Sequence, residues 1–229
     1  MARSPHQVDV RFLPKGLHDR GGAVMCRELQ QCVDEASESE CDAVLMGYAL
    51  CGNGLHGLRA RKVPVVLPRA HDCIALLMGS HKVYAEYFSS HPGTYYRSTG
   101  WLERGQGLDQ TVRMKTGVTL ALDDLIAKYG DDNGRYLFEE MNRYRENYSR
   151  LTYIETGLEP DSRFEDAARA EAGQRGWEFE KFRGSLRIFQ ALVSGEWPEE
   201  DFLVVPPGHR VVARYDERII SEEATEEPA

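Results

Sequence analysis

The residues best suited to chemistry are gathered in two short segments, Cys51-Gly52-Asn53-Gly54 and His71-Asp72-Cys73. Thiolate sulfur and imidazole nitrogen are the usual zinc ligands, and a catalytic zinc keeps three protein ligands and one open position. Cys51 and Cys73 are 22 positions apart (73 − 51), which is not a zinc-finger spacing. The fold must therefore bring them together, as the ends of adjacent parallel strands can do.

These residue types favour a metal ion as the cofactor, and zinc is the metal that they favour most. Asp72 would orient one of the histidines from behind, and the metal would activate a water or a thiol for attack. An iron–sulfur cluster is disfavoured, because it usually takes three or four cysteines and the remaining cysteines lie on or just after a helix. The predicted metal ligands are Cys51, Cys73, His18 and His71.

Metal-free thiol catalysis is an alternative. Cys51 stands just before a glycine turn that leads into a predicted helix, and helix N-termini lower thiol pKa values. His71 or His18 would be the base and Asp72 its orienter, while the N–H groups of residues 52–54 would stabilise an oxyanion. The structural alternative is that both cysteines are small buried residues that fill a tight turn.

A binding module is a third interpretation, in which Gly52-Asn53-Gly54 holds a phosphate or carboxylate through backbone donors. The segment is not a P-loop, and Gly52-x-Gly54-x-x-Gly57 lacks the acidic residue about 20 positions on that dinucleotide binding needs. Arg69 would either pair with an anionic substrate or form a structural salt bridge. Four aromatic residues would either line an organic pocket or simply pack: Tyr48, Tyr95, Tyr96 and Trp101.

The predicted elements alternate between strand and helix, which indicates an α/β fold. In the N-terminal half we expect strands at 8–13, 42–48 and 63–68, and helices at 23–37, at 55–61 and from 74 onward. Such alternation implies a mainly parallel sheet, which binds ligands outside the carboxyl ends of its strands. Three strand ends carry the unusual residues: Gly16-Leu17-His18, the Cys51 turn and His71-Asp72-Cys73.

The rest of the chain repeats this alternation after a bridge. Residues 91–107 are turn-rich and aromatic and could cover the site, and residues 120–128 and 134–148 are helical. We expect two Rossmann-like lobes, or one sheet from two halves, around a central cleft. The predicted C-terminal elements are strands at 151–154, 178–182 and 202–205 and helices at 164–174 and 186–194. The predicted domains are an N-terminal lobe at 1–115, a bridge and C-terminal lobe at 116–220, and a disordered acidic tail at 221–229.

Composition narrows the partners and the location. The 229 residues carry a formal net charge of −9 and show no strong Lys/Arg cluster, which argues against nucleic acid and anionic membranes. The five cysteines are an odd number, no secretory signal precedes them, and no apolar run approaches the ~20 residues of a membrane span. We therefore expect a cytoplasmic protein with reduced thiols.

An ordered string of motifs resembles the bacterial and archaeal family called domain of unknown function 1638, over roughly residues 8 to 220. The motifs are Gly16-Leu17-His18, residues 47–54, Pro68-Arg69-Ala70-His71-Asp72-Cys73-Ile74, Gly79-Ser80, Pro92-Gly93-Thr94-Tyr95-Tyr96 and Thr99-Gly100-Trp101. The resemblance implies an association with corrinoid and methyl-transfer systems. Many members begin with an additional strand that carries a cysteine, which this chain lacks.

The favoured function is a metal-dependent cytoplasmic enzyme that acts on a small anionic or one-carbon-carrying substrate. One alternative is a non-enzymatic accessory protein that binds a metal or a corrinoid and serves a methyltransferase partner protein. The other is the metal-free thiol catalyst described above.

Overall fold

The computed structural model describes residues 4–14, 17, 20–104 and 122–225. Its chain divides into two compact units, the first formed by residues 1–87 with 184–229 and the second by residues 88–183. The division differs from the predicted one, because the end of the chain returns to the unit in which the chain began. Both candidate cysteines belong to the first unit.

The first unit is built on a mixed sheet of three short strands, β1 (Val44–Leu45), β2 (Val65–Pro68) and β6 (Phe202–Val205). β2 is the central strand, parallel to β1 and antiparallel to β6. All four β2 residues are buried, as expected of a strand covered on both faces. Helix α1 (Gly22–Ser37) buries Met25, Leu29 and Val33 in the core that β2 shares.

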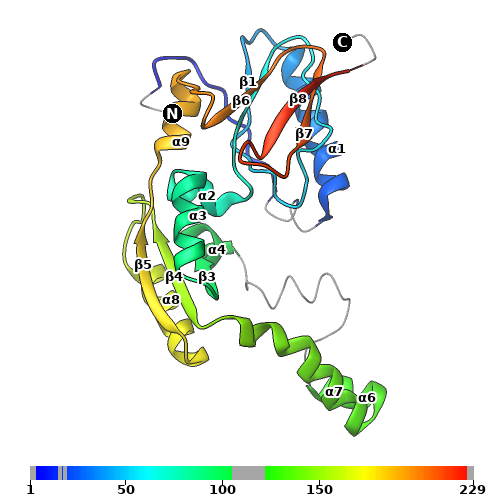
Figure 1. The fold of residues 1–229 in the computed structure, drawn as a ribbon, viewed down its shortest axis with the longest axis vertical. Helices are drawn as coiled ribbons and strands as arrows, with labels where there is room; N and C mark the ends of the chain where they lie inside the picture. Colours follow the sequence, from blue (N-terminus) through cyan, green and yellow to red (C-terminus); the bar gives the residue numbers. More distant parts are fainter. Residues whose placement is uncertain (1–3, 15–16, 18–19, 105–121, 226–229) are drawn as a thin grey trace. The chain divides into compact units, whose positions relative to one another are not determined.

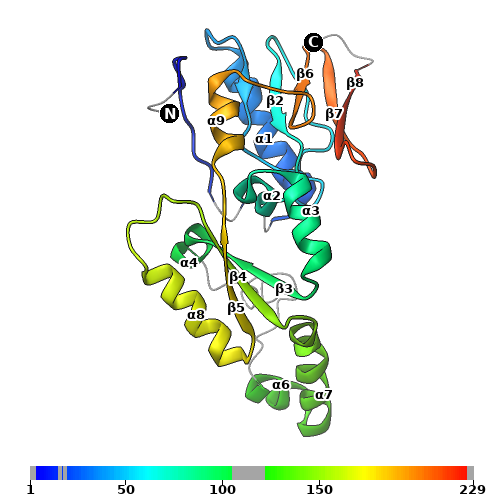
Figure 2. The same ribbon diagram turned by 60° about the vertical axis from the view of Figure 1, so that its left-hand side comes forward.

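The C-terminal segments complete this unit. The antiparallel strands β7 (His209–Ala213) and β8 (Ile220–Ala224) form a hairpin. Helix α9 (Arg187–Ser194) packs its apolar face on a second core cluster, which includes Val66, Ala70 and Phe202. Figures 1 and 2 both show β6, β7 and β8, coloured orange to red, beside the blue and cyan segments of the N-terminal part. Helix α2 (Cys73–Met78) follows β2, and α3 (His81–Ser90) leads into the second unit.

The second unit contains an all-parallel sheet in the order β3 (Thr94–Arg97), β4 (Arg150–Glu155) and β5 (Glu178–Arg183). Helix α8 (Arg163–Arg175) connects β4 to β5 and buries Ala168 and Ala172 against the sheet. Helix α4 (Thr99–Arg104) follows β3. Helices α6 (Leu122–Tyr129) and α7 (Asp131–Asn142) pair with each other, and a 3-10 helix (Arg143–Asn147) leads into β4.

The prediction of an α/β protein is confirmed, and one of the three small sheets is all parallel. Two element predictions are wrong. Residues 8–13 form no strand, since Phe12 is 87% exposed and finds no core. Residues 55–61 are turns rather than a helix, because the N–H groups of Gly57 and Ala60 bond to Val211 and His209 of β7. The N-terminal sheet is mixed, since β6 returns antiparallel to β2.

Three strands were not anticipated. Residues 94–97, expected in a loop, form β3, residues 209–213 form β7, and residues 221–224, expected in a disordered tail, belong to β8. β8 forms because Ile220 and Ser221 are buried and the strand pairs with β7 along its whole length. In the described ranges, no helix has the length and apolar character that crossing a membrane would require.

Candidate functional site

Two parallel strands bring the two predicted segments to one edge of the first unit's sheet. Beyond the paired residues of β1 and β2 the two segments stay side by side, since the Leu50 N–H donates to the Ala70 carbonyl at 2.9 Å. The next bond, also 2.9 Å, runs from the Cys51 N–H to the His71 carbonyl. Cys51 therefore stands beside the segment that ends at Cys73.

The thiols of Cys51 and Cys73 lie within hydrogen-bonding reach of each other. Neither cysteine is in a disulfide, and both are half-buried. The hydrogen bond to Cys51 is the largest cause that raises the pKa of Cys73 far above its ordinary value, followed by burial and the negative charge nearby. The raised pKa favours the protonated form of the Cys73 thiol beside Cys51.

The turn that carries Cys51 has an unusual backbone. Cys51, Gly52 and Asn53 have φ values of 36°, 64° and 64°. Glycine and asparagine tolerate this left-handed region, whereas a cysteine there costs on the order of 1–3 kcal/mol, and such strain concentrates at functional sites. The Gly54 N–H bonds to the Leu50 carbonyl at 2.8 Å. The N–H groups of Gly52 and Asn53 have no hydrogen-bond partner among the residues that the structure describes.

Helix α1 begins directly against this turn. A Cβ on Gly22 would lie 2.5 Å from the Gly52 carbonyl oxygen, and one on Gly54 would lie 2.5 Å from the Met25 sulfur, so neither glycine could be larger without displacing the turn or its neighbour. The N-cap residue Gly21 supplies no side-chain cap, and the first turn of α1 holds no acidic residue. Neither the N-cap nor the first turn of α1 therefore offsets the partial positive charge of this helix end next to the turn.

Asp72 is the N-cap of α2, and Cys73 is the first residue of that helix. One Asp72 carboxylate oxygen accepts hydrogen bonds from the N–H groups of Ile74 at 3.0 Å and Ala75 at 3.2 Å. The sequence suggested that Asp72 orients a histidine. In the structure it fixes the start of the helix that presents Cys73.

Arg69 is buried and donates to backbone carbonyls rather than facing the thiols. Its Nε bonds to Glu199 O at 2.7 Å and Phe202 O at 3.1 Å, and its Nη1 bonds to Arg218 O at 3.0 Å and to Ile220 O. Burial lowers its pKa. These contacts tie β2 to the C-terminal strands, which is neither of the two roles that the sequence suggested.

The predicted metal ligands are only partly brought together. His71 is exposed, and His18 lies outside the described residues. Within the described ranges, no three Cys, His, Asp or Glu side chains are grouped so that they could hold a metal ion. Two thiols alone do not complete the ligand set of a zinc site. The described residues at this site therefore do not by themselves form a complete metal site.

His81, at the start of α3, was missed by the sequence reasoning. Its Nδ1 is buried and makes no hydrogen bond to the described residues. Burial is the main cause that lowers its pKa, and the nearby positive charge of Lys82 adds to it. His71 lies within electrostatic range of the same ring. A sequence signal existed in the short spacing from Cys73, but nothing in the pattern showed that the ring would be buried.

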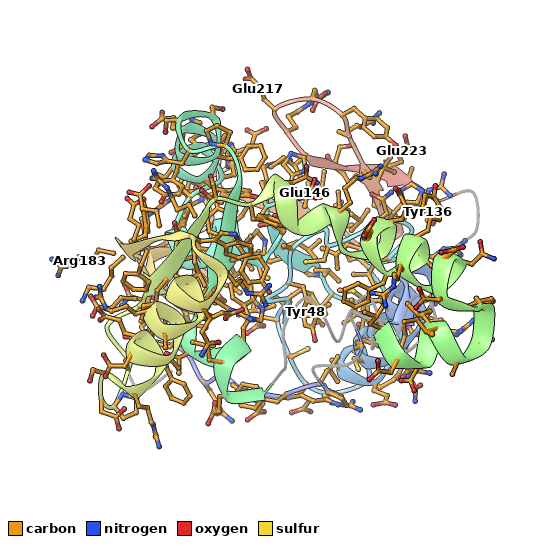
Figure 3. The ribbon with its side chains drawn as sticks, turned by 90° about the horizontal axis from the view of Figure 1, so that it is seen from below. Tyr48, Tyr136, Glu146, Arg183, Glu217 and Glu223 are labelled. Atoms are coloured by element: carbon orange, nitrogen blue, oxygen red, sulfur yellow. The ribbon has the colours of Figure 1, made fainter. Side chains whose placement is uncertain are left out.

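The predicted aromatic lining divides between the two units. Tyr48, labelled in Figure 3, is half-buried against the core that α1 shares with β2. Burial raises the pKa of Tyr48, and Cys32 and Cys51 contribute less. Tyr95 of β3 stacks edge-on with Tyr148 at 5.4 Å and Trp177 at 5.8 Å, which is core packing of the second unit. Tyr96 and Trp101 also belong to that unit, in β3 and α4.

The fold and site together define an α/β protein with a thiol pair at the ends of two adjacent chain segments. The chain belongs to the family described as "Protein of unknown function (DUF1638)", whose model matches residues 12–193. The predicted family resemblance is thereby confirmed, and the matched range includes Cys51 and Cys73. Neither the curated proteins nor the solved structures contain a significant match.

Proposed function

We propose that the chain is a thiol-dependent enzyme in which Cys51 is the nucleophile and Cys73 is its hydrogen-bond donor. The observation that carries the proposal is the contact between these two thiols, neither of which is in a disulfide. A thiolate is the reactive form of cysteine, and a neighbouring S–H donor stabilises it. Because the pKa of Cys73 is raised, we assign the negative charge of the pair to Cys51.

The surroundings of Cys51 support this assignment. The N-terminus of α1 lies against the turn without a capping side chain or an acidic residue, and a helix N-terminus stabilises a nearby thiolate. The strained backbone of Cys51 fits a position selected for function over stability. Cys51 is half-buried, so a small molecule can reach it.

The substrate class follows from the N–H groups of Gly52 and Asn53, which have no partner within the described part of the chain. Two adjacent backbone donors next to a nucleophile can stabilise the negative oxygen that forms when a thiolate adds to a carbonyl. In that step the Cys51 sulfur forms a bond to the carbonyl carbon, and the carbonyl electron pair moves onto oxygen. We therefore propose a small carbonyl substrate.

Selective alkylation tests the proposal. Iodoacetamide is added to the full chain near neutral pH, the reaction is quenched over time, and each cysteine peptide is quantified. Cys51 should react at least roughly tenfold faster than Cys26, Cys32 and Cys41, since one pKa unit changes the thiolate fraction by about that factor. An equal or faster rate at the exposed Cys41 would remove the basis for the assignment.

Matched variants separate the pair from general exposure. Cys73→Ala should slow the labelling of Cys51 because the thiolate loses its donor, and Cys73→Ser should restore much of the rate. Cys41→Ala is the control and should leave the rate at Cys51 unchanged, because the Cys41 thiol donates to the Ala36 carbonyl at 3.4 Å and lies in another part of the unit.

A zinc-dependent enzyme is the second candidate, favoured by the fact that two sulfurs close together can bind one ion. His18 and His71 are its predicted further ligands, and a small anionic or one-carbon-carrying compound is its predicted substrate. Metal content of tag-free protein tests it, compared with the Cys51→Ala/Cys73→Ala double variant. Stoichiometric zinc that the double variant loses would favour this candidate over the free thiol pair.

We also propose three further properties of the protein. They are Rossmann-like lobes around a central cleft, a cytoplasmic location, and a corrinoid or methyltransferase partner protein. A tetrapyrrole that binds tightly without turnover would favour the accessory-protein alternative.

A further inference from the structure

None of the five cysteines is in a disulfide, and they differ in what their sulfurs contact. The Cys26 thiol donates to the His56 carbonyl at 3.3 Å, and the Cys41 thiol donates to the Ala36 carbonyl at 3.4 Å. Cys32 is half-buried on α1, near the charges of Arg11 and Glu35. Cys51 and Cys73, by contrast, have each other's sulfur within hydrogen-bonding reach.

We propose that Cys51 and Cys73 also form a redox pair that exchanges with small disulfides and closes to an internal disulfide. This activity goes beyond carbonyl chemistry but rests on the proposed reactivity of Cys51. The substrate class is a small organic disulfide, because Cys51 and Cys73 are both partly exposed residues that only a compact molecule would reach.

The reaction proceeds by two exchange steps. The Cys51 thiolate attacks one sulfur of R–S–S–R, the S–S bond breaks, and RS⁻ leaves with the electron pair and takes a proton from water. Cys73 then gives its proton to solvent and attacks the Cys51 sulfur, which expels the second RS⁻. The two protein thiols are oxidised, and one small disulfide is reduced to two thiols.

The backbone holds the two partners in place for the second step. The bond from the Cys51 N–H to the His71 carbonyl fixes one segment against the other. Asp72 caps α2 and thereby fixes Cys73 as the first helical residue. The backbone of Cys73 is therefore fixed beside the segment that carries Cys51, with the two thiols within hydrogen-bonding reach.

The test uses the reduced full chain and excess oxidised glutathione. After an acid quench, the remaining thiols are blocked under denaturing conditions, and the peptides are mapped without reduction. The expected product is a peptide pair linked through Cys51 and Cys73, with the other three cysteines blocked as thiols. Cys73→Ser should trap glutathione on Cys51, while Cys51→Ser should leave Cys73 unmodified over the same time.

Two results would overturn the inference. One is a wild-type chain that keeps glutathione on Cys51 without forming the linked peptide. The other is a linked peptide that joins different cysteines. Rapid alkylation of Cys51 without any closure would refute the redox pair and leave the proposed nucleophile intact, whereas slow alkylation together with no exchange would refute both.

Discussion

The N–H of Cys51 donates to the carbonyl of His71 at 2.9 Å, which places Cys51 alongside the segment that reaches Cys73 two residues later. The 22 positions between the cysteines (73 − 51) are thus closed by the adjacency of β1 and β2.

Replacing Gly22 by alanine should disturb the turn that carries Cys51. The new Cβ would lie 2.5 Å from the Gly52 carbonyl oxygen, which is backbone and cannot move freely. We expect a loss of about 1–3 kcal/mol in the free energy of unfolding and slower alkylation of Cys51. Urea unfolding and peptide-resolved labelling measure the two effects.

Gly173→Ala is the matched control, because it also adds a Cβ to a helical glycine but meets no atom within 4 Å. It should stabilise the protein by about 0.5–1 kcal/mol. If the Gly22 and Gly173 variants were equally stable, close contact between α1 and the turn would not matter.

The backbone strain at Cys51 can be measured by comparing Cys51→Ala with Cys51→Gly. Both lose the thiol, but only glycine adopts a φ of 36° without cost. The glycine variant should therefore be more stable than the alanine variant by roughly 1 kcal/mol in chemical unfolding. The reverse order would mean that Cys51 is not strained.

Asp72→Ala should destabilise the start of α2 by about 1 kcal/mol, since Ile74 and Ala75 lose their hydrogen-bond acceptor. Asp72→Asn keeps an acceptor oxygen and should recover most of this stability. The free energies of unfolding of the two variants are to be compared. If the alanine and asparagine variants were equally destabilised, the carboxylate charge rather than the cap would be what matters.

His81 should make the protein less stable in mild acid. Burial lowers its pKa in the folded state, so the unfolded chain takes up a proton first, near its ordinary pKa of about 6.5. Its contribution is complete above that pH and declines as the pH falls toward the lower, folded-state pKa. His81→Gln should remove this part of the pH dependence in unfolding experiments from about pH 7.5 to about pH 5.5. An unchanged pH dependence would contradict the role of His81.

If the cysteine pair closes, the oxidised chain should be more stable than the reduced chain. A disulfide from Cys51 to Cys73 would span 22 positions (73 − 51), and cross-links of this size add about 3 kcal/mol through the unfolded state. Urea unfolding with and without a reductant measures the difference, and the Cys73→Ser variant should show none.

Hydrophobic pattern predicted much of the fold, since long periodic or fully apolar segments have few alternatives. Helix α1, strand β2 and the run from β4 to β6 lie within a few residues of their predicted positions. Residues 8–13 alternate like a strand but form none, because strand formation needs a partner edge that the pattern cannot supply. β7 and β8 were missed because their stability comes from pairing with each other.

The order of the strands was enough to predict that Cys51 and Cys73 lie near each other. Cys51 and Cys73 follow consecutive parallel strands, so their approach is a consequence of topology. The side-chain partners could not be predicted. Arg69 donates to carbonyls more than 130 positions away in the sequence, and the burial of His81 depends on packing that forms only in the folded chain.

The most direct test of the central claim is the time course of iodoacetamide labelling at all five cysteines of the wild-type chain. We expect Cys51 to be labelled at a rate at least roughly tenfold higher than that of the exposed Cys41. A difference of one pKa unit changes the thiolate fraction by about this factor. Labelling that follows solvent exposure alone, with Cys41 ahead of Cys51, would contradict the assignment of Cys51 as the nucleophile.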